Sequence, residues 1–241
     1  MTTATKYMET YQMPENNQSI ATRLQQPQIK VCGLTRVRDA MVCLEAGVDA
    51  IGLVFYPPSS RHVDRDRAAR IAAAVSGQAT SVGVFVDETY DTIMHLADHC
   101  SLQAVQLHGR ESPELIRRLK GNQLTVIKAL FHSRAPYFKE AGAYDASSFL
   151  LECGRGRLPG GNAESWQWQT VRDIDRSKPV ILAGGLTPQN VTTAICRGLP
   201  DAVDVSSGVE SAPGRKQSTK IKAFIEAVTE SDNRRSIRRI L

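Results

Sequence analysis

The sequence predicts an α/β protein built as a single (β/α)8 TIM barrel. From residue 28 onward, short runs rich in β-branched residues alternate with amphipathic runs rich in Ala and Leu. Eight such strand–helix pairs fit between residues 28 and 230, a usual length for one barrel domain. Several strand candidates are apolar almost throughout, as expected for parallel strands covered on both faces. A doubly wound open sheet is the alternative, but it more often has five or six strands, and no GxGxxG turn follows the first strand here.

The expected elements alternate along the whole chain. Strands are expected at 29–32, 49–55, 80–86, 102–108, 124–130, 147–152, 179–184 and 201–206. Helices are expected at 36–46, 64–75, 89–99, 111–120, 134–142, 163–172, 187–197 and 218–230. Thr35, Ser112 and Thr187 stand at helix starts as N-caps. The glycines that end helices are Gly47, Gly77, Gly121 and Gly198.

The two ends of the chain are expected to lie outside the barrel domain, which we assign to residues 28–230. Residues 1–27 have neither helical nor strand periodicity and are expected to form a flexible leader. Residues 231–241 read SDNRRSIRRIL, and their four Arg and one Asp contribute +3 to the net charge of +5. We expect this basic tail to be a solvated, frayed terminus. The nearly neutral remainder argues against a nucleic-acid-binding protein with a basic face.

Composition predicts a cytoplasmic protein without a membrane partner. The five cysteines are scattered and form no CxxC pair, so neither a disulfide framework nor a zinc site is expected. No apolar run approaches the roughly eighteen residues of a membrane span. The N-terminus lacks the pattern of a signal peptide. A monomer and a homodimer both remain open.

The ends of the predicted strands carry the polar side chains that chemistry requires. In barrels of this type, the C-terminal strand ends and the loops after them form the active face. The residues at these positions are Cys32, Arg61, Asp87, His108, Lys128, Glu152, Gly184, Gly185, Asp204, Ser206, Ser207 and Gly208.

Glycine- and serine-rich loops follow the seventh and eighth strands, where such barrels commonly bind phosphate. Gly184, Gly185, Ser206, Ser207 and Gly208 offer backbone N–H groups and hydroxyls to an anion. Either loop alone would be an ordinary tight turn. Together they predict a small phosphorylated substrate.

Cys32 and Glu152 each have a structural and a catalytic interpretation. A cysteine is often an ordinary core residue. Cys32, however, stands at a strand exit near a predicted helix N-terminus, whose dipole lowers a thiol pKa. Its position leaves both interpretations open. Glu152 is either solvated at the strand tip or, across the barrel from a thiolate, a proton donor to a leaving oxygen.

The other polar residues have weaker assignments. Arg61 is either a surface residue or the partner of a substrate carboxylate. Asp204 faces either the barrel interior or a substrate hydroxyl. His108 is interpreted as a satisfied polar residue at the barrel rim, and Asp87 and Lys128 as structural. A metal-dependent pentose-phosphate epimerase would need paired His and Asp ligands at strand exits. Only one histidine stands at such an exit, so no metal site is predicted.

Six segments in the right order resemble phosphoribosylanthranilate isomerases, a family of ribulose-phosphate-binding barrels. They are KVCGLT, GLVFYPPSSRHV, VGVFVDE, AVQLHG, LAGGLTPQNV and DVSSGVESAPGRK, and the resemblance covers residues 28 to about 228. It implies an Amadori rearrangement of N-(5′-phosphoribosyl)anthranilate to 1-(2-carboxyphenylamino)-1-deoxyribulose 5-phosphate in tryptophan biosynthesis. It also implies that no metal or organic cofactor is needed.

The resemblance implies roles for individual residues. Cys32 would be the general base that takes the proton from ribose C2′. Arg61 would hold the anthranilate carboxylate, Asp204 would lie beside the reacting sugar, and the two glycine- and serine-rich loops would bind the 5′-phosphate. Ring opening by an acid gives an iminium that acidifies C2′–H, so a base with a pKa near neutrality can remove this proton.

The chain departs from the family pattern at the sixth strand. The family has roughly LLD followed by GGTG-x-TFDW, with the Asp as general acid, whereas this chain reads FLLECGRGRLPGGNAESWQW. Glu152 replaces that Asp, and Gln167 replaces an Asp before Trp168. Because glutamate is longer by one methylene, its carboxyl is expected to overshoot or swing aside unless the altered loop compensates. Misplacement by about 1 Å costs on the order of a hundredfold in rate. A non-catalytic or weakly active phosphosugar-binding barrel is therefore the alternative function.

Overall fold

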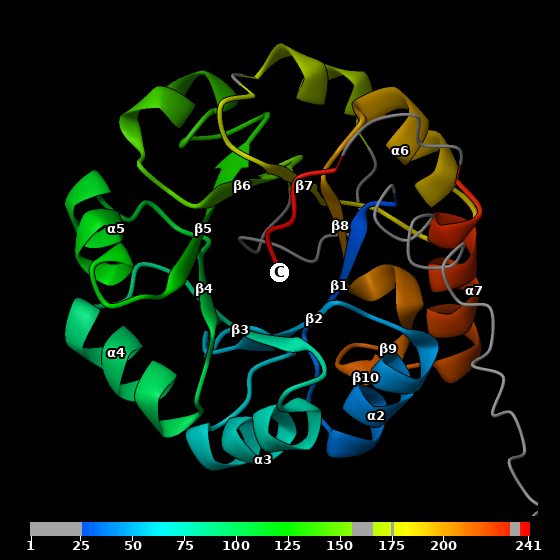
Figure 1. Cartoon of the computed structure of the whole chain (residues 1–241), viewed down its shortest axis with the longest axis horizontal. Helices are drawn as coiled ribbons and strands as arrows, with labels where there is room; N and C mark the ends of the chain where they lie inside the picture. The colour runs from blue at the N-terminus through cyan, green and yellow to red at the C-terminus, as the bar shows by residue number, and fades with distance from the viewer. Residues whose placement is uncertain (1–25, 156–165, 175, 232–236) are drawn as a thin grey trace, which may run out of the picture.

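The computed structural model describes residues 26–155, 166–174, 176–231 and 237–241. Eight parallel strands form a closed barrel in the order of the sequence, from β1 to β8 (Figure 1). The strands are β1 (Gln28–Cys32), β2 (Ala50–Val54), β3 (Thr80–Phe85), β4 (Ala104–Leu107), β5 (Thr125–Phe131), β6 (Ser148–Glu152), β7 (Val180–Leu182) and β8 (Ala202–Val205). The predicted (β/α)8 barrel is confirmed.

Helices surround the barrel and alternate with the strands (Figure 1). The α-helices are α2 (Val37–Ala46), α3 (Arg65–Val75), α4 (Tyr90–His99), α5 (Pro113–Lys120), α6 (Val191–Gly198) and α7 (Ser218–Thr229). The 3₁₀ helices are η1 (Phe138–Ala143), η2 (Trp168–Asp173) and η3 (Ser207–Val209). A short antiparallel pair, β9 (Glu210–Ala212) and β10 (Arg215–Lys216), follows β8. Asp64, Thr89 and Ser112 cap α3, α4 and α5 through their side chains.

Two expected α-helices are 3₁₀ helices instead. The expected helix at 134–142 is replaced by η1, which begins after Pro136. The expected helix at 163–172 is replaced by η2, and its first three residues lie outside the described part of the chain.

The helix expected from residue 187 begins only at Val191. The Asn190 side chain accepts a hydrogen bond from the Thr187 N–H at 2.8 Å and donates one to the Gly185 carbonyl at 2.9 Å. These bonds close a turn ahead of the helix, as asparagine side chains commonly do.

The hydrophobic core has two layers. An outer layer fills the space between strands and helices. An inner layer fills the barrel itself; its residues are Ala50, Val82, Ala104, Ile127, Ala129, Phe131, Leu150, Ile181, Ala183 and Ala202. Because strand side chains alternate between faces, Lys30 and Cys32 share one face of β1. The strand register sets Lys30 beside Asp204 of β8 and Cys32 beside Gly52 of β2.

The C-terminal residues 237–241 lie at the N-terminal end of the barrel, and Figure 1 shows the terminus near the barrel axis. The expected frayed terminus is wrong for these residues, because they form hydrogen bonds with the starts of β1 and β8. The expected leader falls outside the described residues apart from its last two. Among the described residues, no helix is both long and apolar enough to cross a membrane.

Candidate active site

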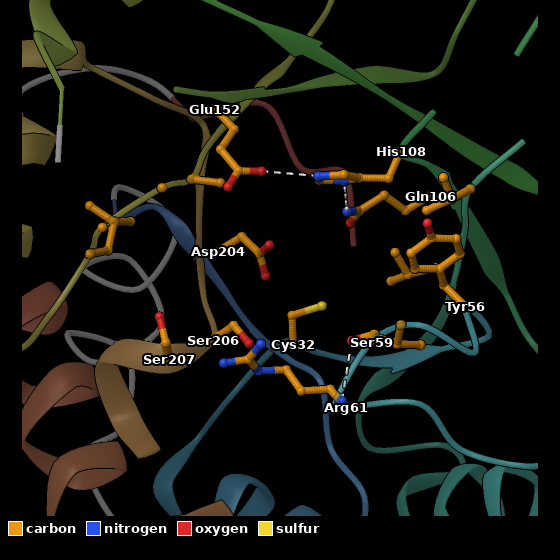
Figure 2. A pocket seen from close by; sticks show the side chains of 17 residues that line it. Cys32, Tyr56, Ser59, Arg61, Gln106, His108, Glu152, Asp204, Ser206 and Ser207 are labelled. Atoms are coloured by element: carbon orange, nitrogen blue, oxygen red, sulfur yellow. Dashed lines mark hydrogen bonds and ion pairs between the residues drawn. The ribbon is translucent and has the colours of Figure 1, made fainter. Parts of the chain in front are cut away.

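A cavity opens at the C-terminal end of the barrel strands. Eight of the nine site residues expected from the sequence line it: Cys32, Arg61, Glu152, Gly184, Gly185, Asp204, Ser206 and Ser207. In the view of Figure 2, Cys32 and Arg61 lie on one side, Glu152 lies on the other, and Asp204 lies between them. Strand exits that are distant in the sequence therefore meet at one site.

The ninth residue, Gly208, joins the two glycine- and serine-rich loops. A Cβ at this position would collide with the carbonyl oxygen of Leu186 in the loop after β7. Only glycine permits this close approach of two backbones. Gly208 thus brings the loops after β7 and β8 together beside the cavity.

Cys32 ends β1 and lines the cavity, where it clusters with Val54 and Val84. Space for the thiol comes from Gly52 on the neighbouring strand. A Cβ on Gly52 would lie 2.5 Å from the Cys32 Sγ. Sequence reasoning did not single out Gly52, although a glycine inside a strand commonly marks such a close approach.

Burial raises the pKa of the Cys32 thiol above its usual value. The Lys30 ammonium lowers this pKa, Asp204 raises it and Lys216 lowers it, but burial dominates. The expected lowering by a helix dipole is wrong in direction. The helix in question, α2, begins only at Val37, beyond the loop that follows the thiol.

Lys30 and Asp204 form an ion pair at the base of the site. The Lys30 Nζ lies 2.9 Å from the Asp204 Oδ1, and the lysine side chain is fully buried. Burial alone would lower the pKa of Lys30, but Asp204 and Cys32 outweigh it and raise this pKa above its usual value. Sequence reasoning missed Lys30, although a lysine between two apolar residues of a buried strand was a usable signal.

Arg61 is buried and held by Glu210. Its Nε and Nη2 donate to the two Glu210 carboxylate oxygens at 2.9 and 2.8 Å. Lys216 also donates to Glu210, at 2.9 Å, and to the Ser206 carbonyl, at 3.0 Å. Burial would raise the pKa of Glu210, but Arg61 and Lys216 hold it below its usual value. Sequence reasoning missed Glu210 and Lys216. Both lie in the segment VESAPGRK, and only the fold shows that these two side chains are bonded to each other and that Glu210 holds Arg61.

Glu152 is bonded to His108 in the cavity wall (Figure 2). The Glu152 Oε2 lies 2.9 Å from the His108 Nε2, and the His108 Nδ1 lies 2.8 Å from the Gln106 Nε2. All three residues line the cavity. His108 therefore does more than satisfy its own polar atoms at the rim, because it lines the cavity and contacts the Glu152 carboxyl.

Asp87 and Lys128 have structural contacts, in agreement with the sequence. The Lys128 Nζ lies 2.8 Å from the Glu111 Oε2 within the barrel wall. The Asp87 carboxylate accepts from the Arg110 backbone N–H. Within the described residues, no group of three or more His, Cys, Asp or Glu side chains is arranged to hold a metal ion.

Together, the closed parallel barrel and the thiol, carboxyl and glycine-rich loops at its C-terminal end define a (β/α)8-barrel enzyme with its chemistry at that end. The family model for N-(5′-phosphoribosyl)anthranilate (PRA) isomerase matches residues 29–227. This chain belongs to the phosphoribosylanthranilate isomerase family and is an isomerase.

Individual relatives agree with the family assignment. An N-(5′-phosphoribosyl)anthranilate isomerase of Desulfatibacillum aliphaticivorans is 50% identical over 204 residues, which cover 85% of this chain and 94% of that protein. The phosphoribosyl anthranilate isomerase of Thermotoga maritima is 38% identical, with a TM-score of 0.77 over 84% of this chain and 98% of that one. A second structure of the Thermotoga maritima enzyme, 38% identical with a TM-score of 0.74, is a complex with reduced 1-(o-carboxyphenylamino)-1-deoxyribulose 5-phosphate and covers the same shares.

We predict that Gly52→Ala displaces the Cys32 thiol and lowers kcat by about tenfold or more, because a small misplacement of a reacting group is costly. The matched control is Gly83→Ala on β3, where a Cβ would instead meet Leu102 and Phe85. The control should lower the thermal midpoint through overpacking while leaving kcat close to that of the unaltered protein. A Gly52→Ala protein with unchanged kcat would contradict this role.

We also predict that the Cys32 thiol ionises above the ordinary thiol pKa of about 8.5, because burial disfavours its charged form. The measurement is the thiolate absorbance near 240 nm as a function of pH. The Cys32→Ser protein provides the difference spectrum, in which the other cysteines cancel. Since a raised pKa keeps the proton bound to higher pH, a midpoint below the ordinary value contradicts the prediction.

Proposed function

We propose that this protein converts N-(5′-phosphoribosyl)anthranilate to 1-(2-carboxyphenylamino)-1-deoxyribulose 5-phosphate, the Amadori rearrangement of tryptophan biosynthesis. The observation that carries this proposal is the placement of Cys32 and Glu152 on opposite sides of one cavity, beside the two glycine- and serine-rich loops. The related Thermotoga maritima enzyme with a bound reduced carboxyphenylamino-deoxyribulose phosphate supports the same substrate.

Glu152 is the general acid in this proposal. It donates a proton to the ribose ring oxygen while the bond from that oxygen to C1′ breaks and the anilino nitrogen forms an iminium with C1′. Its carboxyl is bonded to His108 and lies in the cavity wall, which supports this role. The altered loop that was expected to compensate, at 156–165, lies outside the described residues.

Cys32 is the general base. Because burial raises the pKa of the Cys32 thiol, the thiol first loses its proton to solvent; the resulting thiolate removes the C2′ proton, which the iminium acidifies, and an enaminol forms. The thiol then returns a proton to C1′, and the proton of the C2′ hydroxyl goes back to Glu152, so protons balance over the cycle. A positioned acid or base contributes typically about 10²- to 10⁴-fold to a rate.

Asp204 and Arg61 orient the substrate. Asp204, fixed by its ion pair with Lys30, accepts hydrogen bonds from ribose hydroxyls between the acid and the base. Arg61 is fixed by Glu210 through Nε and Nη2, and we assign its Nη1 to the anthranilate carboxylate.

The phosphate is assigned to the loops after β7 and β8. Gly184, Gly185, Ser206 and Ser207 line this side of the cavity. Gly184 and Gly185 have φ angles of 88° and 68°, a conformation that glycine adopts at little cost and that exposes backbone N–H groups. Gly208 contributes by keeping the two loops in contact.

The proposal predicts that Cys32→Ala and Glu152→Gln each lower kcat by at least about 10²-fold, because each removes one proton-transfer group. The measurement is single-turnover conversion of phosphoribosylanthranilate, with thermal unfolding to show that both proteins are folded. The matched controls are Cys196→Ala and Glu114→Gln, since both side chains are exposed and lie outside the cavity.

Full turnover in either variant would reject the assignment of that residue. An unaltered protein that binds the reduced product analogue tightly without turning over substrate would instead identify the alternative function, a non-catalytic phosphosugar-binding barrel.

A further inference from the structure

We propose that Gln106, His108 and Glu152 form a hydrogen-bonded chain that stores the catalytic proton. Within these hydrogen bonds, the Gln106 side-chain amide rotates by a half-turn when the extra proton binds to His108 or leaves it. The inference rests on the proposed function, in which Glu152 is the acid. Figure 2 shows the three side chains linked in the cavity wall, and the two bonds measure 2.8 and 2.9 Å.

The orientation of the Gln106 amide identifies a state without the extra proton. An amide nitrogen only donates, so the His108 Nδ1 accepts and the ring hydrogen resides on Nε2. The Nε2–H then donates to the Glu152 Oε2, and in the proposed chain Glu152 is a carboxylate in this state. This state cannot protonate a ring oxygen until one more proton binds from solvent.

Gln106 also carries the group that accommodates this proton. Its Oε1 is buried and has no hydrogen-bond partner among the described residues, which is uncommon for a buried oxygen. When the extra proton binds, the His108 Nδ1 also carries hydrogen and needs an acceptor. A half-turn of the amide replaces Nε2 by Oε1 at this position. Gln106 can therefore pair with the imidazole in both protonation states.

Charged groups from several elements surround the pair. Arg134, in the loop after β5, interacts with Glu152 and stacks on Phe131, whose ring meets His108 edge-on. Behind the histidine, Lys128 is neutralised by Glu111 and donates to the carbonyl of Gly109. The groups across the cavity are Lys30, Cys32, Arg61 and Asp204. An acceptor at the His108 Nδ1 therefore has to come from Gln106.

The test is the titration of His108 in the full chain, followed by nitrogen-15 NMR of the imidazole. Gln106→Glu places a permanent acceptor at Nδ1 and should raise the titration midpoint by about one pH unit or more. Gln106→Met removes both the donor and the acceptor and should lower the midpoint. It should also lower kcat by about tenfold, with KM changed less than about threefold. The His108→Gln protein assigns the signal, and His132 in the same spectra serves as an internal control.

Midpoints that stay the same in both Gln106 variants would overturn this inference. Its failure is distinguishable from failure of the proposed function. A fully active Glu152→Gln protein rejects Glu152 as the acid. An inactive Glu152→Gln protein combined with unmoved His108 titration rejects only the proton store.

The N-terminal end of the barrel carries a second, independent observation. We infer that it is a binding site for the chain's own C-terminal peptide, residues 237–241. This peptide lies beyond residue 227, where the match to the family ends. Gln28, the first residue of β1, binds this peptide through its side-chain amide. The Gln28 Oε1 accepts hydrogen bonds from the Ile240 and Leu241 N–H groups at 2.5 and 3.1 Å. The Gln28 Nε2 donates to the Leu241 carbonyl at 2.6 Å.

Charge pairing adds to these hydrogen bonds. The Arg238 Nη2 lies 3.0 Å from the Asp201 Oδ2, and this aspartate is fully buried. Arg238 also donates to the backbone carbonyls of Arg176 and Lys178, both at 2.7 Å. Arg239 forms an exposed ion pair with Asp49 at 2.8 Å. Arg238 therefore compensates the buried charge of Asp201, whereas Arg239 pairs with Asp49 nearer the surface.

The apolar end of the peptide completes the inner core. Ile240 and Leu241 pack against the inner layer of the barrel, whose members include Ala50, Ala104 and Ala202 at strand starts. These small residues leave room that the two larger side chains occupy. The peptide therefore forms the floor of the barrel, at the end opposite the catalytic cavity.

Deletion of residues 237–241 should lower the thermal midpoint by about 5 °C or more. It should leave kcat/KM at 25 °C within about threefold of the full chain, because the cavity lies at the other end. The synthetic peptide IRRIL, which corresponds to residues 237–241, should raise the midpoint of the shortened protein when added at millimolar concentration.

Arg238→Ala and Arg239→Ala form a matched pair that does not depend on the shortened protein folding. Arg238→Ala should lower the midpoint clearly more, because it leaves Asp201 with less compensation in the interior, while exposed ion pairs contribute little. A shortened protein with an unchanged midpoint, no response to the peptide, or equal effects of the two arginine substitutions would each overturn the inference.

Discussion

The buried ion pair between Lys30 and Asp204 is the interaction on which the active end of the barrel depends. It joins the first strand to the last at the place where the barrel closes. Neither charge would be tolerated there alone, because an unpaired buried ion is strongly destabilising. The pair also sets the field around Cys32, since the ammonium favours the thiolate and the carboxylate opposes it. Barrel closure and the ionisation of the Cys32 thiol therefore depend on the same contact.

The strand-exit residues of the site could be predicted from the sequence, but their partners could not. In a barrel of parallel strands all C-terminal ends share one rim, so Cys32, Glu152 and the glycine- and serine-rich loops had to be near one another. The partners depend on register and side-chain direction, which periodicity does not give. Lys30 meets a residue 174 positions away, and His108 turns from its strand exit toward Glu152.

The fold was predictable where local pattern and packing agree. The barrel and most helix limits follow from alternating periodicities. Ser112, Gly47 and Gly121 are caps as expected, whereas Thr35 and Thr187 precede the actual N-caps, Arg36 and Asn190. The α-helices predicted after the fifth and sixth strands were wrong. Amphipathic spacing suggested α-helices there, but only short 3₁₀ helices form, and Pro136 lies just before the first of them. The prediction of a frayed C-terminal tail was wrong for another reason. An arginine-rich terminus is typical of a solvated tail, and its partners Asp201 and Gln28 are distant in the sequence, so the sequence pattern does not reveal them.

The bond from Glu152 to His108 gives this side chain a defined place in the cavity wall. The central claim is that this carboxyl and the Cys32 thiol act on opposite faces of one ribose. A crystal structure with the reduced product analogue tests it most directly. The account predicts the Sγ and the Glu152 carboxyl within about 3–3.5 Å of the sugar on opposite faces, with the phosphate at the loops after β7 and β8. A sugar that Glu152 does not reach, or a thiol directed away from it, would contradict the account.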